Sequence, residues 1–328
     1  EMAKNDWDSF EQSWDFKKHP FVKYHVKTMA EAYECWSTEC TDRFNKTKEN
    51  EEEINRLFAK IYNIENDVTC DLLDEEITIR KADIYRDITS FISYAVGCMF
   101  GRYSLTREGL CKGEIDLSDE EVAKDNILLI TDEEYIDNDI VARFIAILRK
   151  VFGADTLEEN LSFIAEHIDC KGNSSREILR NYFANDFYKN HCKDCTVAIS
   201  GKRPMYWLFD SGKQNGFKAL IYMHRYNADT IGNLRVDYLH RIERIYESEI
   251  NRMQDTIDNS NIAREITSAT KRKEKLQKQL KECKDFDEKI GHLALSRIKI
   301  DLDDGVKVNY EKVQTANDGK KYQVLAKI

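Results

Sequence analysis

Proline is nearly absent from this chain of 328 residues, which contains Pro20 and Pro204 and no other. Because proline breaks helices, its scarcity in a chain rich in Lys, Glu, Ile and Leu favours a mainly α-helical fold. The sequence also lacks any apolar run of about 18 residues, so it predicts no membrane-spanning helix. Residues 1–6 are polar and do not form a signal peptide, and we expect a cytoplasmic protein.

Catalytic and cofactor-binding motifs are missing as well. None of the 13 glycines lies two residues from another, which removes the usual loops for dinucleotides and S-adenosylmethionine. Gly212-Lys213 lacks the other residues of a phosphate-binding P-loop. No Pro-Pro or Pro-Asp pair, serine elbow, His-Glu-x-x-His or zinc-deaminase pattern occurs. The sequence therefore predicts no catalytic residue and no cofactor within this chain.

Cysteine, by contrast, is frequent, with nine residues. Several of them fall on apolar faces of predicted helices, which fits free thiols in a reducing compartment better than disulfides. His191, Cys192 and Cys195, with Cys170 upstream, have residue types that bind zinc. A structural zinc site usually shows two such cysteine pairs, so we interpret these as ordinary thiols and predict no metal site. Zinc at Cys192 and Cys195 stays an open alternative.

Charge is unevenly spread along the chain. Residues 1–200 carry 25 basic and 41 acidic side chains, a net of −16, whereas residues 201–300 carry 20 and 14, a net of +6. An acidic body repels nucleic acid, but a basic block can dock phosphate. Solvated helix faces are the alternative interpretation of any single charge run. The most basic stretch contains Lys271, Arg272, Lys273, Lys275, Lys278, Lys281 and Lys284.

Apolar periodicity predicts a series of helices. An amphipathic helix or helix pair begins near Pro20 and ends near residue 62, and Ile54, Leu57, Phe58 and Ile61 continue its expected core face. Further helices are expected over 82–103 and 140–152, and then around 157–164. Ser174 and Glu177 are typical of a capping box that begins the next helix. A short strand is expected at 126–131.

The second half predicts two hairpins. Residues 205–209 and 217–223 have strand character and are joined by a turn-rich connector, which indicates a β-hairpin with a mobile tip. Residues 232–290 carry two apolar stripes separated by a turn at 258–261, which indicates an antiparallel helical hairpin. The predicted fold class is therefore mainly α: a multi-helix array with a small β-hairpin and a C-terminal antiparallel helical hairpin.

We divide the chain into three segments. Residues 1–104 form an N-terminal helical segment and residues 105–200 an acidic helical segment. Residues 201–328 hold the β-hairpin, the basic helical hairpin and the tail. The aromatic cluster that follows a non-Met start indicates the C-terminal part of a longer protein, with a tag remnant as the alternative.

Five residues in and after the β-hairpin are candidates for contact with DNA phosphates or bases. They are Lys213, Gln214, Lys218, Arg225 and Arg235. Intramolecular pairing with nearby acidic residues explains the same arginines equally well.

Several stretches together resemble a known family. They are residues 6–11 (DWDSFE), 13–16 (SWDF), 90–105 (SFISYAVGCMFGRYSL), 202–213 (KRPMYWLFDSGK) and 301–310 (DLDDGVKVNY). The chain resembles the C-terminal region of the PglX family, the adenine-specific DNA methyltransferases of BREX phage-defence systems. Related fused restriction–modification adenine methyltransferases are the second match. The resemblance extends from Asp6 to Ile328.

The resemblance implies a parent enzyme that transfers a methyl group from S-adenosylmethionine to N6 of adenine and so marks host DNA. The cofactor loop and catalytic motif would lie upstream of Glu1, so no catalytic residue is carried over. We predict that this chain is a non-catalytic part that binds and clamps double-stranded DNA against the upstream methyltransferase domain. The alternative is a protein-interaction module that docks other defence-system components. Neither interpretation involves a membrane.

Overall fold

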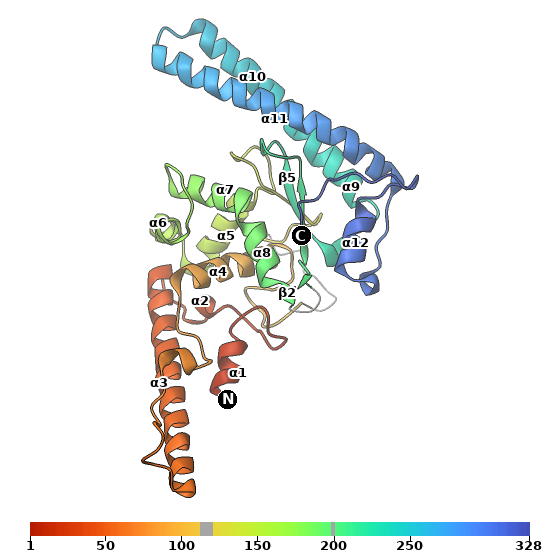
Figure 1. Ribbon diagram of the computed structural model, residues 1–328. Coiled ribbons are helices and arrows are strands. Elements are labelled where there is room, and N and C mark those ends of the chain that lie inside the picture. Colours follow the sequence, from red (N-terminus) through yellow and green to blue (C-terminus); the bar gives the residue numbers. More distant parts are fainter. Residues whose placement is uncertain (112–120, 198–200) are drawn as a thin grey trace. The chain divides into compact units, whose positions relative to one another are not determined.

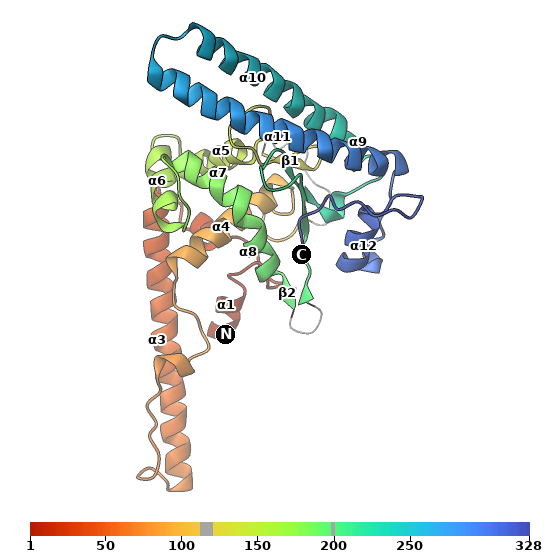
Figure 2. The same ribbon diagram turned by 45° about the horizontal axis from the view of Figure 1, so that its top comes forward.

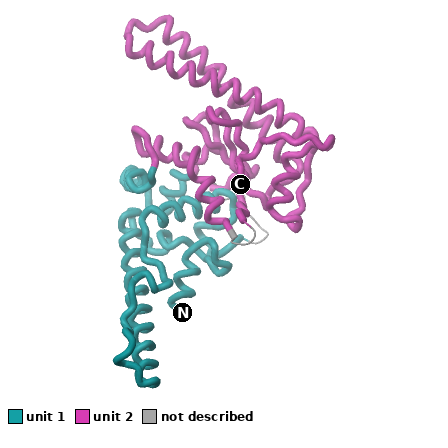
Figure 3. The backbone as a smooth tube through the Cα atoms, viewed as in Figure 1, with its two compact units in different colours: residues 1–116, 144–169 teal, residues 117–143, 170–328 magenta. Residues whose placement is uncertain are grey.

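The computed structural model describes residues 1–111, 121–197 and 201–328, and Figure 1 labels its helices and strands. The backbone forms two compact units, coloured separately in Figure 3. Unit 1 contains residues 1–116 and 144–169, and unit 2 contains residues 117–143 and 170–328. No helix among the described residues is long and apolar enough to cross a membrane.

The three predicted segments do not coincide with these units. Residue 104 lies inside unit 1, and the predicted boundary at residue 200 lies outside the described residues. One unit boundary falls within helix α5 (Ile140–Phe152). A continuous helix carries no change of composition or breaker residue at such a point, so sequence patterns do not reveal it.

Unit 1 is helical. Its elements are α1 (Met2–Trp7), α2 (Pro20–Lys23), α3 (Met29–Tyr62), a 3₁₀ turn (Asp74–Glu76), α4 (Ile84–Met99), the larger part of α5, and α6 (Leu157–His167). Helix α3 begins at a capping box in which Thr28 accepts from the Glu31 amide and Glu31 accepts from the Thr28 amide. Trp36 is buried and donates a 3.0 Å hydrogen bond to Asp87 of α4, which ties the two helices together.

The outer half of α3 corrects one sequence prediction. The inner part of the expected core face is buried, as at Trp36, but Ile54, Leu57, Phe58 and Ile61 are exposed. Their spacing is that of a core-facing stripe. No described segment of unit 1 covers it, because the chain that follows α3 returns along another side of the helix.

Unit 2 is built on a three-stranded antiparallel sheet. Its strands are β1 (Ile127–Leu129), β5 (Lys218–Tyr222) and β4 (Tyr206–Asp210), in that order, so Leu220 lies between Leu128 and Leu208. The predicted strand and β-hairpin are confirmed. The C-terminal segment covers the outer edge of β4, where the Ala326 amide donates to the Leu208 carbonyl over 2.8 Å. A separate two-stranded sheet pairs β2 (Thr196–Val197) with β3 (Gly201–Lys202).

The helices of unit 2 include the predicted helical hairpin. They are α7 (Ser175–Asn185), α8 (Phe187–Asp194), α9 (Thr230–Asn233), α10 (His240–Asn259), α11 (Ala263–Ser296) and α12 (Val306–Val313). A π-helical turn over Leu234–Leu239 leads into α10. Figures 1 and 2 both show α10 and α11 side by side as an antiparallel pair. The mainly α fold class is confirmed.

One apolar core joins the sheet of unit 2 to the helical hairpin. Trp207 and Phe217 from the hairpin strands and turn pack with Tyr246 of α10 and with Leu276 and Phe286 of α11. All five side chains are buried. The core therefore places the β4–β5 turn against the middle of the most basic helix in the chain.

We expect Trp36→Phe to lower the free energy of unfolding by about 1–2 kcal/mol, because the aromatic packing is kept while the buried Asp87 carboxylate loses a donor. Urea unfolding followed by circular dichroism measures the change. Trp14→Phe is the matched control, since Trp14 is 96% exposed and the substitution removes no buried packing. Equal stabilities of the two variants would contradict the role given to the Trp36–Asp87 hydrogen bond.

Candidate nucleic-acid interface

The turn between β4 and β5 is held by one carboxylate of α11. Glu282 accepts hydrogen bonds from the Ser211 hydroxyl (2.8 Å) and from the backbone amides of Gln214 (2.8 Å) and Gly216 (3.0 Å). Glycine is required at position 216, because a Cβ there would lie 2.6 Å from the Gln279 carbonyl oxygen. The turn is thus docked on α11, which corrects the expectation of a mobile tip.

Exposed lysines lie on the turn itself and on the part of α11 that leads to this docking point. Lys213 projects from the turn, and Lys271, Lys278 and Lys281 lie on α11 before Glu282. All four are exposed, and within the described residues none of their ammonium groups has a hydrogen bond or ion pair. Spacings of seven and three residues place the three α11 lysines on adjacent parts of one helix surface. We call Lys213, Lys271, Lys278 and Lys281 the lysine ridge.

DNA contact by the five residues proposed from the sequence stays a prediction, and the structure separates them into two groups. Lys213 and Gln214 are exposed at the turn, which contacts α11 at Gln279 and Glu282. Lys218 is 7% exposed, donates to the Ala184 carbonyl over 2.7 Å and lies 3.4 Å from the Asp210 carboxylate. Its ammonium group holds β5 to α7 and does not face solvent.

The two arginines are likewise engaged within unit 2. Arg225 donates to the carbonyl oxygens of Ala123 (2.8 Å) and Lys124 (2.9 Å). Arg235 forms a two-point ion pair with Asp287 of α11, at 2.7 and 2.8 Å. The structure therefore does not bring Lys218, Arg225 and Arg235 to the lysine ridge, because each cation is engaged by other groups of unit 2.

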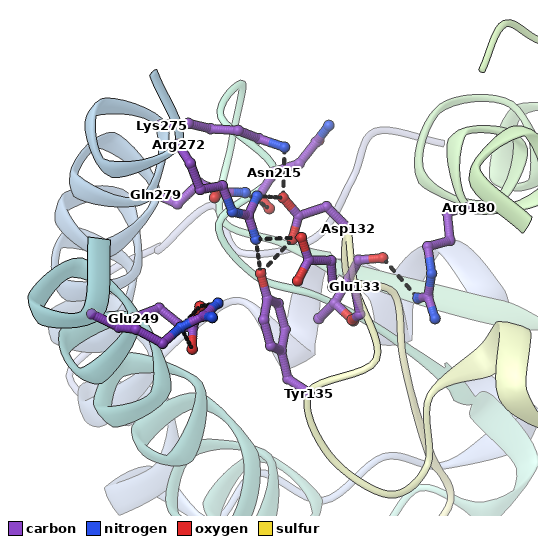
Figure 4. Close-up of polar contacts among 11 residues, drawn as sticks. Asp132, Glu133, Tyr135, Arg180, Asn215, Glu249, Arg272, Lys275 and Gln279 are labelled. Carbon is purple, nitrogen blue, oxygen red and sulfur yellow. Dashed lines mark hydrogen bonds and ion pairs between the residues drawn. The ribbon is translucent and has the colours of Figure 1, made fainter. Parts of the chain in front are cut away.

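A second group of α11 cations is used structurally (Figure 4). Arg272 pairs with Asp132 at 2.8 Å and with Glu133 at 3.0 Å, and Lys275 pairs with Asp132 at 2.5 Å. Arg272 also donates to the Tyr135 hydroxyl. Burial raises the pKa of Asp132, but hydrogen bonds from Lys275 and Arg272 outweigh it and hold the pKa at about 2. These ion pairs fasten α11 to the loop after β1.

The His191–Cys195 stretch has a local structural role. His191 Nε2 accepts from the backbone amides of Met205 (3.1 Å) and Tyr206 (3.3 Å), which links α8 to the start of β4. Cys192 is buried, and the Cys195 sulfur lies 3.8 Å from the His191 ring nitrogens. Among the described residues, no group of three or more His, Cys, Asp or Glu side chains is arranged to hold a metal ion.

Comparison with known proteins identifies the relatives of this chain. It is 39% identical over 324 residues to "Adenine-specific methyltransferase PglX" of Lacticaseibacillus casei (strain Zhang) and 35% identical over 347 aligned positions to "Adenine-specific methyltransferase BrxX" of Escherichia coli O9:H4 (strain HS). Each match covers 95% of this chain. The chain corresponds to one part of PglX and BrxX. The resemblance seen in the sequence is thereby confirmed.

The matched part is a minor share of each relative. The chain spans 27% of the length of PglX and 28% of the length of BrxX. No protein-family model matches it. Similarity to PglX and BrxX therefore supports a role connected with an adenine-specific methyltransferase, and the function of this part has to be argued from its own residues.

Sequence reasoning found the lysines of the ridge but not the residue that organises them. Lys271, Lys278 and Lys281 were visible as part of a basic stretch, and Lys213 as part of a polar turn. Glu282 carries no signal in the sequence, because it is one acidic residue in a charged helix. Its importance comes from donors 66 to 71 residues away.

We expect Asp132→Asn to lower the free energy of unfolding by about 2 kcal/mol at neutral pH. The folded-state pKa of Asp132 is below its ordinary value, so its contribution is complete above about pH 4 and is lost as pH falls toward 2. Denaturant unfolding at pH 6 and pH 3.5 should therefore show a smaller difference from the parent protein at the lower pH. Asp285→Asn, on an exposed part of α11, is the control and should change little.

Proposed function

We propose that this chain is a non-catalytic, DNA-holding part of a site-specific adenine DNA methyltransferase that marks host DNA in phage defence. The whole enzyme would take its methyl group from S-adenosylmethionine, which would bind outside this chain. Flipping the adenine out of the duplex would expose N6 to the cofactor. The similarity to PglX and BrxX supports the methyltransferase context.

The lysine ridge is the observation that carries the DNA-holding role. A lysine that is already paired with a carboxylate gains less from a phosphate, because the existing ion pair competes with the new one. Lys213, Lys271, Lys278 and Lys281 are exposed and have no ion pair within the described residues, so they can neutralise phosphates directly. Neighbouring cations such as Arg272 and Lys275 are already paired with Asp132, so their role is to hold α11 to the loop after β1.

The docking of the turn on α11 also fixes where the charged side chains of the ridge lie relative to one another. Glu282 fixes the backbone of residues 214 and 216, which places Lys213 and Gln214 at a set position relative to the helix lysines. A rigid arrangement loses less conformational entropy on binding than four independent side chains on mobile loops would. Gln214 is the one uncharged member of the predicted set and is suited to hydrogen bonding with a base edge or phosphate.

Replacing Lys213, Lys278 and Lys281 with alanine should flatten the salt dependence of DNA binding. Each phosphate contact contributes about 0.9 to the slope of log affinity against log salt, so the triple variant should lose up to about 2.7. Fluorescence anisotropy of a duplex titrated with the full-length protein at several salt concentrations measures the slope. Lys299→Ala, also exposed and outside the ridge, is the control. An unchanged slope in the triple variant would contradict the proposal that the lysine ridge contacts DNA phosphates.

Glu282→Gln separates positioning from charge. The substitution removes one negative charge beside the ridge, so a purely electrostatic effect would strengthen DNA binding. It also replaces a carboxylate that accepts three hydrogen bonds with an amide that offers one oxygen, which should release the turn. We expect weaker binding, by about 3- to 10-fold, because up to about 1.4 kcal/mol of preorganisation is lost. Stronger binding would show that the turn position is unimportant.

A further inference from the structure

The outer half of α3 presents a row of large apolar side chains to solvent. Ile54, Leu57, Phe58, Ile61 and Tyr62 are 49%, 55%, 56%, 70% and 69% exposed. Their positions differ by three, four, seven and eight residues, so they share one helix face. The Phe58 and Tyr62 rings stack with centroids 6.5 Å apart, which makes the row continuous. We call these five residues the outer stripe of α3.

The chain's own return path leaves this face open. After α3 the backbone runs back along the helix, where Arg56 pairs with Asp71 at 3.1 Å and Glu52 accepts from the Leu72 amide over 3.1 Å. Ala59, on the same side as these contacts, is buried. Helical spacing places Glu52, Arg56 and Ala59 on the side opposite the stripe. The returning segment thus packs on the face of α3 opposite the stripe and leaves the apolar face exposed to solvent.

Acidic residues border the outer stripe. Glu51 and Glu53 flank it on α3, and Glu65 and Asp67 follow just after the helix. The cations of this stretch are Lys60 and Arg56, and Arg56 is already paired with Glu52 and Asp71. None of the four bordering carboxylates has an ion pair within the described residues. Two copies of this chain joined through the stripe would bring eight carboxylates together, which opposes self-association. A partner with basic flanks would instead neutralise them.

We propose that the outer stripe of α3 docks an amphipathic helix of a separate partner protein, with large apolar residues on one face and Lys or Arg beside them. Apolar side chains at three- and four-residue spacing are the anchors of helix-to-helix recognition. The acidic border selects the sign of charge on the partner and excludes acidic helices. About two helical turns make a small interface, so the affinity should be roughly micromolar.

Two designed peptides test this proposal on the full-length protein. Both carry leucine at the a and d positions of three heptads; one has lysine at the e and g positions and the other has glutamate. Fluorescence polarisation should show saturable binding of the lysine peptide and at least tenfold weaker binding of the glutamate peptide. Equal binding of the two peptides would overturn the proposal.

Variants of the stripe separate docking from general attraction between a basic peptide and an acidic protein. Leu57→Glu with Ile61→Glu adds negative charge, so unspecific attraction would grow, whereas docking on the stripe should weaken by at least tenfold. Because both side chains are already more than half exposed, the variant should stay folded by circular dichroism. Glu51→Lys with Glu53→Lys leaves the stripe intact and should reverse the preference between the peptides.

Other occupants of the stripe give different results. A concentration-dependent dimer in sedimentation that disappears in the Leu57→Glu, Ile61→Glu variant would assign the stripe to a second copy and overturn the proposal. Failure of the lysine peptide to bind, together with hydrogen-exchange protection of residues 54–62 beyond that of the remainder of α3, would assign it to another part of the same protein. Neither result depends on DNA binding by the lysine ridge.

Discussion

One carboxylate, Glu282, is the main polar link between the two hairpins of unit 2. It accepts three hydrogen bonds from the β4–β5 turn, and the Tyr246 hydroxyl of α10 adds a fourth contact through its hydrogen bond to the Gly216 carbonyl over 2.9 Å. Without these contacts the turn would be an ordinary polar loop at the end of a small sheet. The sheet, α10 and α11 thus share this polar junction in addition to one apolar core. This junction sets the position of Lys213 and Gln214 relative to α11, whereas the other three lysines of the ridge are placed by the helix itself.

The cations of unit 2 fall into two groups, those with a carboxylate within ion-pair distance and those without one. Arg235, Arg272 and Lys218 have carboxylates within ion-pair distance, so their charge is used to hold helices and strands together. The ridge lysines have no such neighbour among the described residues and remain in solvent. Similar residue types in one stretch of sequence therefore have opposite roles. The difference lies in which acidic side chain the fold brings within about 4 Å.

In unit 1, apolar residues of one sequence pattern likewise have different roles, depending on what the fold places next to them. Trp36 and Ile54 belong to one continuous periodic pattern on α3, yet Trp36 is buried against Asp87 while Ile54 is half exposed. Periodicity indicates that a helix has an apolar face, but it does not state what covers that face. In the outer half of α3, the covering element is absent from the described residues. An exposed stripe with an acidic border is therefore a property that only the three-dimensional arrangement reveals.

The amino-acid sequence by itself determined the class of fold, because scarce proline and strong helical periodicity are local properties that each segment carries alone. It also determined the β-hairpin, the antiparallel helical hairpin and the resemblance to the PglX family, which rests on residue identity along nearly the whole chain. Tertiary structure decided the division into units, the fixed turn on Glu282 and the availability of each lysine or arginine. Contacts such as Arg235–Asp287 and Arg272–Asp132 join residues 52 and 140 positions apart, and no local pattern encodes which distant partner a charged side chain will meet.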